Sequence, residues 1–180
     1  MTYIDIEHLK FPIGKFSVPE TISSDQIQEA IEYLKAFPSY LADSVNLMSE
    51  SQLDTPYRPG GWTIKQVIHH IADSHMNAYS RFKMALTEDN PTIKPYDESA
   101  WAKLADASLA IDSSMAIIKA VHFKWAVILE SMTDEDFQKT YFHPEKKRSQ
   151  TLAEVTLMYT WHSKHHLAHV HLPSLSGGKL

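Results

Sequence analysis

The segment from Thr63 to Phe82 reads TIKQVIHHIADSHMNAYSRF. Its apolar residues recur at intervals of three and four, which is the period of one face of an α-helix. Thr63 is followed three residues later by Gln66, the spacing of a capping box at a helix start. We therefore predict a helix that begins after Thr63 and continues to about Leu86. Its inward face consists of Ile64, Val67, Ile68, Ile71, His75, Ala78, Tyr79 and Phe82.

Three further amphipathic helices are predicted on either side of this one. The first covers about residues 23–48 and starts with another capping box, although Pro38 should break or kink it near the middle. The next covers about residues 111–132. The last starts with a capping box at residues 151–154 and ends before Pro173, because proline does not continue a helix.

The connections between these helices are long. Residues 1–22 read as an extended arm, a short helix is expected around Trp101, and residues 133–150 read as irregular with a short hairpin. Four amphipathic helices without a larger strand pattern or a repeat predict an all-α fold, a four-helix bundle with long connecting loops. We expect a single domain over residues 1–180.

The composition is that of an ordinary globular protein. Of the 180 residues, 43% are hydrophobic and 22% are charged, which excludes a disordered chain. No stretch approaches the roughly 18 consecutive apolar residues of a membrane helix. The first ten residues lack the layout of a signal peptide. We therefore expect a cytoplasmic protein with no membrane partner.

The charge balance argues against nucleic-acid binding. The formal net charge is −5, whereas nucleic-acid binders usually carry a basic surplus. The one dense cationic run is KKR at residues 146–148, which is short enough to be a solvated loop tip. We therefore expect a small-molecule partner.

The chain contains no cysteine and eleven histidines. The lack of cysteine excludes disulfides, thiolate nucleophiles and every zinc site built on cysteine, and it is consistent with a reducing compartment. Any bound metal must therefore be held by histidine, aspartate or glutamate.

The last predicted helix contains HSKHHLAHVH from His162 to His171. His162, His166 and His169 share one helical face with apolar residues. His162 and His166 are four residues apart, so both rings can reach one ion, as in HExxH zinc helices, although no glutamate lies between them. The alternative is a row of half-exposed histidines along a polar edge. Because burying several imidazoles without a partner is costly, a metal site is a serious hypothesis.

The helix that follows Thr63 contains three more histidines. Periodicity places His75 at the centre of the apolar face, His70 at its edge and His69 nearer the opposite side. Periodicity alone therefore predicts that His75 points inward. It does not select a metal ligand.

Motifs from several parts of the chain form a recognisable set. They are GGWT at residues 60–63, HHIADSHMN at 69–77 and WHSKHHLAH at 161–169, with further matches at FPIG (11–14), LDTPYR (53–58), RFK (81–83), LTED (86–89), IKPY (93–96) and FHPE (142–145). Together these motifs resemble the DinB superfamily. More narrowly, they are similar to its YfiT-type subgroup, also called bacillithiol transferases, whose relatives are often labelled metal-dependent hydrolases.

The resemblance implies an up-down-down-up four-helix bundle, usually a homodimer, with a divalent metal held by three histidines. On the family pattern, these ligands are His70, His162 and His166. Zinc is the metal expected, with nickel or another first-row metal as the alternative. The remaining histidines of the two helices do not match ligand positions, so they would support the ligands, contact a second subunit or lie on the surface: His69, His75, His165, His169 and His171.

The resemblance also implies an activity. A small thiol of the bacillithiol type would bind the metal as a thiolate and attack an electrophilic small molecule, so the enzyme would be a metal-dependent S-transferase. Since the chain has no cysteine, the nucleophile has to arrive with the cosubstrate. One alternative is a metal-dependent hydrolase that uses a metal-activated water, for which Asp73 is the nearest candidate base. Another is a non-catalytic dimer that binds a metal or ligand.

Two further groups of residues are candidates for substrate contacts. Residues 87–96 and Trp101 could form a pocket wall, or they could be a stiff connection and a core residue. Arg58, Arg81 and Lys94 could bind the carboxylates of an acidic cosubstrate, with ordinary surface charges as the alternative.

Overall fold

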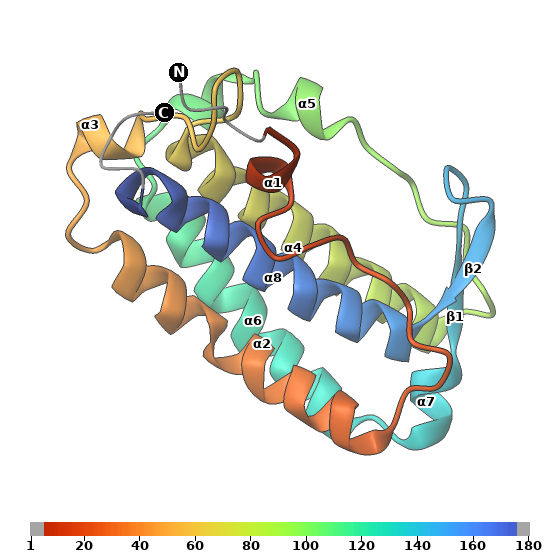
Figure 1. Cartoon of the computed structure of the whole chain (residues 1–180). Coiled ribbons are helices and arrows are strands. Elements are labelled where there is room, and N and C mark those ends of the chain that lie inside the picture. Colours follow the sequence, from red (N-terminus) through yellow and green to blue (C-terminus); the bar gives the residue numbers. More distant parts are fainter. Residues whose placement is uncertain (1–5, 176–180) are drawn as a thin grey trace.

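The computed structural model describes residues 6–175, and a bundle of four long helices forms most of that range (Figure 1). Each long helix occurs where the sequence predicts one. No helix within the described residues is long and apolar enough to cross a membrane. The four helices are α2 (Ser24–Val45), α4 (Ile64–Thr87), α6 (Asp112–Ser131) and α8 (Leu152–Leu175).

The helices are arranged in a ring in which α2 and α4 are not neighbours. α2 packs along α8 and α6, and α4 packs along the same two helices. In Figure 1, α2 and α8 run in one direction and α4 and α6 run in the other. The order along the chain is therefore up-down-down-up, as predicted. The consequence for the site is that α4 and α8 lie antiparallel, with their histidines facing each other.

Short elements occupy the connections. A helix does form at Trp101, and residues 133–150 do contain a hairpin, as predicted. Its antiparallel strands pair Thr140 with Thr151 and His143 with Arg148. The short elements are α1 (Ile6–Lys10), α3 (Glu50–Leu53), α5 (Glu98–Trp101), the 3₁₀ helix η1 (Ala105–Ser108), α7 (Asp134–Gln138), β1 (Thr140–His143) and β2 (Arg148–Thr151).

Local sequence determines where α2 and α4 begin. The hydroxyl of Ser23 accepts from the amide of Gln26, and the side chain of Gln26 accepts from the amide of Ser23. Thr63 and Gln66 form the same reciprocal pair at the start of α4. Each box pairs two amides that the first helical turn would leave without partners, so both predicted starts are confirmed.

The N-terminal segment differs from the predicted extended arm in one place. Ile6–Lys10 form the helix α1, and residues 11–23 follow without a long helix or strand. Residues 1–5 of the predicted arm lie outside the described residues. The short helix matters below, because its last carbonyl contacts a histidine of α8.

α2 continues through Pro38, so the break predicted there is absent. Proline has no amide hydrogen, which leaves the carbonyl of Leu34, one turn earlier, without its helical partner. The Nδ1–H of His122 on α6 donates to that carbonyl at 2.6 Å instead. A side chain from another helix thus replaces the hydrogen bond that the proline removes.

α8 also continues past its proline, to Leu175, whereas the sequence predicted an end before Pro173. Pro173 lies in the last turn of the helix. There it removes a single hydrogen bond at the helix end, which is less disruptive than a proline near the middle.

Two clusters of buried apolar side chains fill the bundle, and histidines lie between them. One cluster includes Trp125 and the other includes Phe37. The ring of His75 lies 5.7 Å from that of Phe37 and 6.3 Å from that of Trp125. His122 contacts the same two rings. His75 points inward, as its periodicity predicts, but its neighbours include other imidazoles.

Candidate metal centre and adjoining pocket

α4 and α8 bring three histidines to one point. His70 comes from α4, and His162 and His166 come from successive turns of α8. One ring nitrogen from each can be chosen so that all three lie within 4.8 Å of one another. The Nε2 atoms of His70 and His162 are 3.2 Å apart. These are the residues that the resemblance selected, and the structure places them together.

The spacing of these nitrogens fits a divalent metal. Imidazole nitrogens bind zinc at roughly 2.0–2.1 Å, so two ligands of a tetrahedral site are separated by about 3.3 Å. The 3.2 Å separation of the His70 and His162 nitrogens matches this value. The rings of His162 and His166 are 4.4 Å apart at their centroids, as expected for neighbours four residues apart on a helix.

Burial keeps these imidazoles neutral. It lowers the pKa of His70 from 6.5 to about 4, together with the neighbouring His165. Burial and the neighbouring histidines hold the pKa values of His162 and His166 well below the same ordinary value. At neutral pH each ring therefore has one nitrogen with a free lone pair, the form that binds a metal.

Aromatic side chains surround the three histidines. The ring of Trp62, which precedes α4, lies 4.9 Å from His70. The ring of Tyr159, one turn before His162 on α8, lies 5.5 Å from that residue. An ion at this point would be surrounded by rings on several sides, and charge interactions in such a poorly hydrated site are stronger than in water.

Two more histidines contact the Nδ1 atoms of the candidate ligands His162 and His166. His75 Nε2 lies 3.1 Å from His162 Nδ1, and His169 Nδ1 lies 3.3 Å from His166 Nδ1. His165, His166 and His169 form a second group whose nitrogens are close enough to hold an ion. The side chains of His75 and His169 thus contact the candidate ligands, as the supporting role considered for them from sequence requires.

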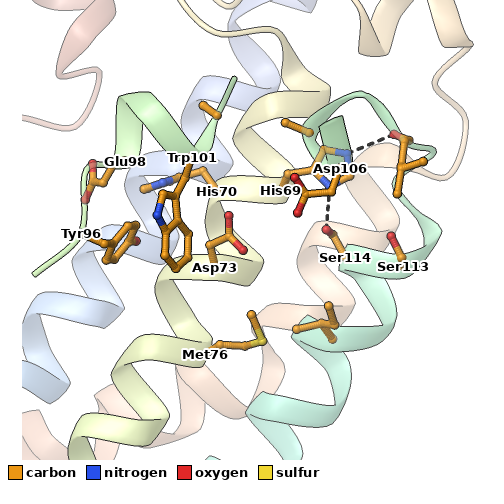
Figure 2. A pocket seen from close by; sticks show the side chains of 14 residues that line it. His69, His70, Asp73, Met76, Tyr96, Glu98, Trp101, Asp106, Ser113 and Ser114 are labelled. Atoms are coloured by element: carbon orange, nitrogen blue, oxygen red, sulfur yellow. Dashed lines mark hydrogen bonds between the residues drawn. The ribbon is translucent and has the colours of Figure 1, made fainter. Parts of the chain in front are cut away.

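The other histidines of α4 and α8 are directed elsewhere. His69 donates from Nε2 to the carbonyl of Leu109 at 3.1 Å and accepts at Nδ1 from the hydroxyl of Ser114 at 2.7 Å. Its ring therefore ties α4 to α6 (Figure 2). His165 stacks on Trp161. His171 is exposed, and its Nε2 lies 3.1 Å from the hydroxyl of Ser44.

A pocket of about 260 Å³ adjoins His70. Figure 2 shows side chains from α4, α5 and the start of α6 around it. The rings of Tyr96 and Trp101 are tilted against each other with centroids 4.3 Å apart, and both residues line the pocket. Trp101 and one end of the loop at residues 87–96 thus form a wall, one of the two alternatives left open from sequence. The polar and aromatic lining includes His69, His70, Asp73, Tyr96, Glu98, Trp101, Asp106, Ser113 and Ser114.

The pocket is acidic, contrary to the hypothesis of cationic carboxylate contacts. Arg58 lies over the ring of Tyr57, and Arg81 is buried and donates to the carbonyl of Lys94 at 3.1 Å. None of the three predicted cations is among the pocket residues. Partial burial, together with the carboxylate of Asp106, raises the pKa of Asp73 in the pocket wall.

Comparison of the sequence with known protein families identifies one family. The sequence pattern of one family, described as the DinB superfamily, matches residues 33–170. The chain belongs to the DinB superfamily. Among its DinB relatives, YfiT of Bacillus subtilis is 46% identical over 164 residues, which cover 91% of this chain and 92% of YfiT. A relative from Bacillus pumilus is 45% identical over 162 residues, with 90% and 93% coverage.

Solved structures confirm the DinB bundle. The structure of YfiT matches with a TM-score of 0.91 and 45% identity over 94% of this chain and 98% of that chain. It is described as a probable metal-dependent hydrolase with an unusual four-helix bundle topology. The mycothiol-dependent maleylpyruvate isomerase matches with a TM-score of 0.63 and 15% identity, covering 80% and 60% of the two chains. At that identity the second match shows a shared fold.

Sequence reasoning missed some residues near the site. His122 contacts His75 at 2.7 Å, yet it lies in an apolar stretch with no motif around it. Asp106 and Glu98 line the pocket from elements too short for periodicity to reveal. The signal that could have led to His122 is Pro38, since a proline inside a helix implies a free carbonyl four residues earlier.

Proposed function

We propose that this DinB protein is a metal-dependent enzyme that transfers a low-molecular-weight thiol of the bacillithiol type to electrophilic small molecules. His70, His162 and His166 would hold one divalent metal, for which Zn²⁺ is the candidate. One observation carries the proposal: three neutral imidazoles converge beside a pocket, in a chain that has no cysteine. The nucleophile of a thiol transfer would therefore come with the cosubstrate.

The side chains of the site have separate tasks in this proposal. A divalent metal held there supplies a Lewis acid, which lowers the pKa of a bound thiol or water toward neutrality. The three histidines are neutral ligands, so they do not offset the charge of the ion. Trp62 and Tyr159 limit the access of water. The pocket formed by Asp73, Trp101 and their neighbours receives the substrate.

Hydrolysis is the second candidate, and Asp73 is the observation that favours it. A hydrolase needs a general base near the attacking water. Asp73 lies one helical turn after His70 and lines the same pocket, and its pKa is raised, which is the direction that general-base catalysis favours. YfiT, the relative at 46% identity, is described as a probable metal-dependent hydrolase.

One assay separates the two candidates. Zinc-loaded protein would be mixed with an aryl halide or an aryl ester, with and without cysteamine, and with and without a chelator. Thiol transfer predicts consumption of the halide that needs both thiol and metal. Ester cleavage that needs the metal but not the thiol would contradict the proposal and favour hydrolysis. A protein that turns over neither compound would be a binding protein.

The acidity of the pocket makes a further prediction about the thiol. Asp73, Glu98 and Asp106 line it, and no lysine or arginine of the described chain does. A thiol that carries a protonated amine should therefore bind better than a neutral one. Replacing both Asp73 and Asp106 with Asn should raise the KM for cysteamine about two- to fivefold, the scale of partly exposed charge pairs.

The matched control for this prediction is 2-mercaptoethanol, which has the same length and no charge. Its KM should be the same in the double variant and in the unsubstituted protein, when initial rates are measured over a range of thiol concentrations. An equal rise for both thiols would show that the substitutions disturb the pocket generally. That result would refute selection by charge.

A further inference from the structure

Four groups, one from each long helix, form a continuous row of close polar contacts. His162 Nδ1 on α8 lies 3.1 Å from His75 Nε2 on α4. His75 Nδ1 lies 2.7 Å from His122 Nε2 on α6. His122 Nδ1 lies 2.6 Å from the carbonyl oxygen of Leu34 on α2. The other nitrogen of His162, Nε2, faces His70 at the candidate metal site.

The carbonyl at the end of the row determines where every proton lies. A carbonyl oxygen can only accept, so His122 must donate from Nδ1. A neutral imidazole has one donor and one acceptor, so His122 Nε2 must accept from His75 Nδ1. By the same rule, His75 Nε2 accepts from His162 Nδ1. The Nε2 atom of His162 is then left without a proton, and its lone pair is directed at the candidate metal site.

Pro38 explains why this carbonyl is available. In an uninterrupted helix the carbonyl of Leu34 would accept from the amide of residue 38. Residue 38 is a proline, which has no amide hydrogen, and α2 nevertheless continues through it. The proline thus supplies a free acceptor in the middle of a buried helix face. A backbone feature of α2 therefore determines the proton positions on a ring of α8.

The surroundings of the row keep its rings neutral. His75 is fully buried and His122 is 2% exposed, between the side chains of Phe37 and Trp125. A charged imidazole buried among these apolar rings is costly, so both rings are neutral. The alternative in which His75 carries two protons, and so reverses His162, is therefore disfavoured.

The other ligand of α8 has a shorter row of the same kind. His169 Nε2 lies 3.2 Å from the carbonyl oxygen of Lys10, the last residue of α1. The carbonyl makes that nitrogen the donor, so His169 Nδ1 accepts from His166 Nδ1 at 3.3 Å. His166 is then also protonated at Nδ1 and has a free lone pair at Nε2.

We propose that these two rows of hydrogen bonds, called relays below, keep the proton of His162 and of His166 on Nδ1, so that both residues bind a metal through Nε2. His75, His122 and His169 act as positioning residues. The relays end on the backbone carbonyls of Leu34 and Lys10. Their role at a metal rests on the proposed function, whereas their proton positions follow from the chain alone. Partners of this kind fix ring orientation, and their loss typically lowers metal affinity about 10- to 100-fold.

The relays also decide between the two histidine groups that are close enough to hold an ion. In the shorter relay His169 donates from Nε2 to the carbonyl of Lys10 and accepts at Nδ1 from His166, so His169 has no free lone pair for a metal in the group His165, His166 and His169. With that hydrogen bond in place, His166 has one free lone pair, at Nε2. The chain should therefore bind one zinc ion, at His70, His162 and His166.

Proton positions can be measured directly in the metal-free protein. Long-range ¹H–¹⁵N spectra of ¹⁵N-histidine-labelled protein distinguish protonated from unprotonated ring nitrogens. We expect His75, His122, His162 and His166 to be protonated at Nδ1, and His169 at Nε2. Protonation of His75 or His162 at Nε2 instead would overturn the proposal. This result does not depend on metal binding, so it stands apart from the proposed function.

Variants at His122 test the effect on the metal, because this residue lies too far along the row to be a ligand. His122→Leu removes the acceptor for His75 Nδ1–H, so the Nδ1 protonation of His75 and His162 should become mixed. Zinc affinity, measured by competition with a chromophoric chelator, should fall about tenfold or more. His122→Gln keeps an acceptor oxygen and should restore most of the affinity.

His69→Gln is the matched control, because His69 on α4 is also buried but belongs to neither relay. Its zinc affinity should stay near that of the unsubstituted protein. A folded His122→Leu variant with unchanged proton positions and affinity would overturn the proposal. If that variant does not fold, the spectra of the unsubstituted protein decide. If the unsubstituted protein binds no zinc at all, the proposed function fails, and those spectra still decide the relays.

Discussion

His162→Ala and His166→Ala are expected to lose bound zinc, whereas His171→Ala is expected to keep it. The first two substitutions each remove one of three nitrogens that lie within 4.8 Å of one another. Loss of a residue that only supports a ligand costs about 10- to 100-fold in affinity, so loss of a ligand should cost at least about 100-fold. His171 is on the same helix but contacts Ser44 on the outside of the bundle.

Elemental analysis of protein purified without a histidine tag would measure this loss. About one zinc per chain is expected for the unsubstituted protein and for His171→Ala, and little for the other two variants. His70→Ala completes the set, since the third ligand comes from α4. Equal zinc content in all variants would show that the ion is held elsewhere and would remove the basis of the proposed function.

The metal-free protein is expected to lose most of its stability between about pH 6.5 and about pH 4. His70 and His122 titrate near 6.5 in an unfolded chain, but burial lowers both pKa values to about 4 in the folded protein. Between these values the unfolded state binds more protons, so the free energy of unfolding falls as the pH falls. The stability that these two histidines contribute is fully present above their pKa in the unfolded chain. It is lost as the pH falls through their pKa in the folded protein.

The expected size of this effect is large. Each pKa unit corresponds to about 1.4 kcal/mol, so each of these two buried residues contributes about 3 kcal/mol over the whole interval. Together they approach the roughly 5–15 kcal/mol of a typical domain. The lowered pKa values of His75, His162 and His166 act in the same direction. Acid unfolding should therefore begin while most surface carboxylates are still ionised.

Urea unfolding in the presence of a chelator, at about pH 7.5 and about pH 5, would measure the difference in free energy. The variant His122→Leu lacks one of the histidines whose pKa is lowered by burial. Its free energy of unfolding should therefore depend less on pH, whatever its absolute value. Added zinc should oppose the loss, because the metal binds the neutral rings. A free energy of unfolding that is the same at both pH values would contradict the burial of neutral histidines.

The long helices could be predicted because their signals are local. Thr63 and Gln66 form the cap that the sequence indicates, and the apolar period of the following segment matches the buried face of α4. The same reasoning placed His162 and His166 on one face of α8. Even the inward direction of His75 followed from its position in the period.

The choice of His70 could not be made from local signals. It lies at the edge of the apolar face, and only the packing of α4 against α8 determines whether that edge meets other histidines. The family resemblance supplied this residue. The resemblance to the DinB superfamily and the predicted bundle topology are both confirmed. The bacillithiol-type thiol, zinc, the homodimer and the cytoplasmic location stay predictions.

The role of His122 could not be predicted from sequence for a different reason. Its partners, Leu34 and His75, are 88 and 47 positions away along the chain, so no window of sequence contains the relay. The two predictions about proline failed for related reasons. Pro38 does not break α2 because α6 supplies the missing donor, and Pro173 lies too near the end of α8 to stop it. Both outcomes depend on where each proline sits in the folded bundle.

The position of α8 as the last helix of the bundle has a consequence for biosynthesis. His70 and His162 are 92 positions apart, and both candidate ligands of α8 leave the ribosome after the other helices of the described chain. A nascent chain that ends before Leu152 would contain only His70 of the three proposed ligands, so it could not form this site. A metal ion bound there could therefore not assist the folding of α2, α4 and α6 before α8 is made. Metal binding at the proposed site would therefore follow the synthesis of α8 and its packing against α2 and α4.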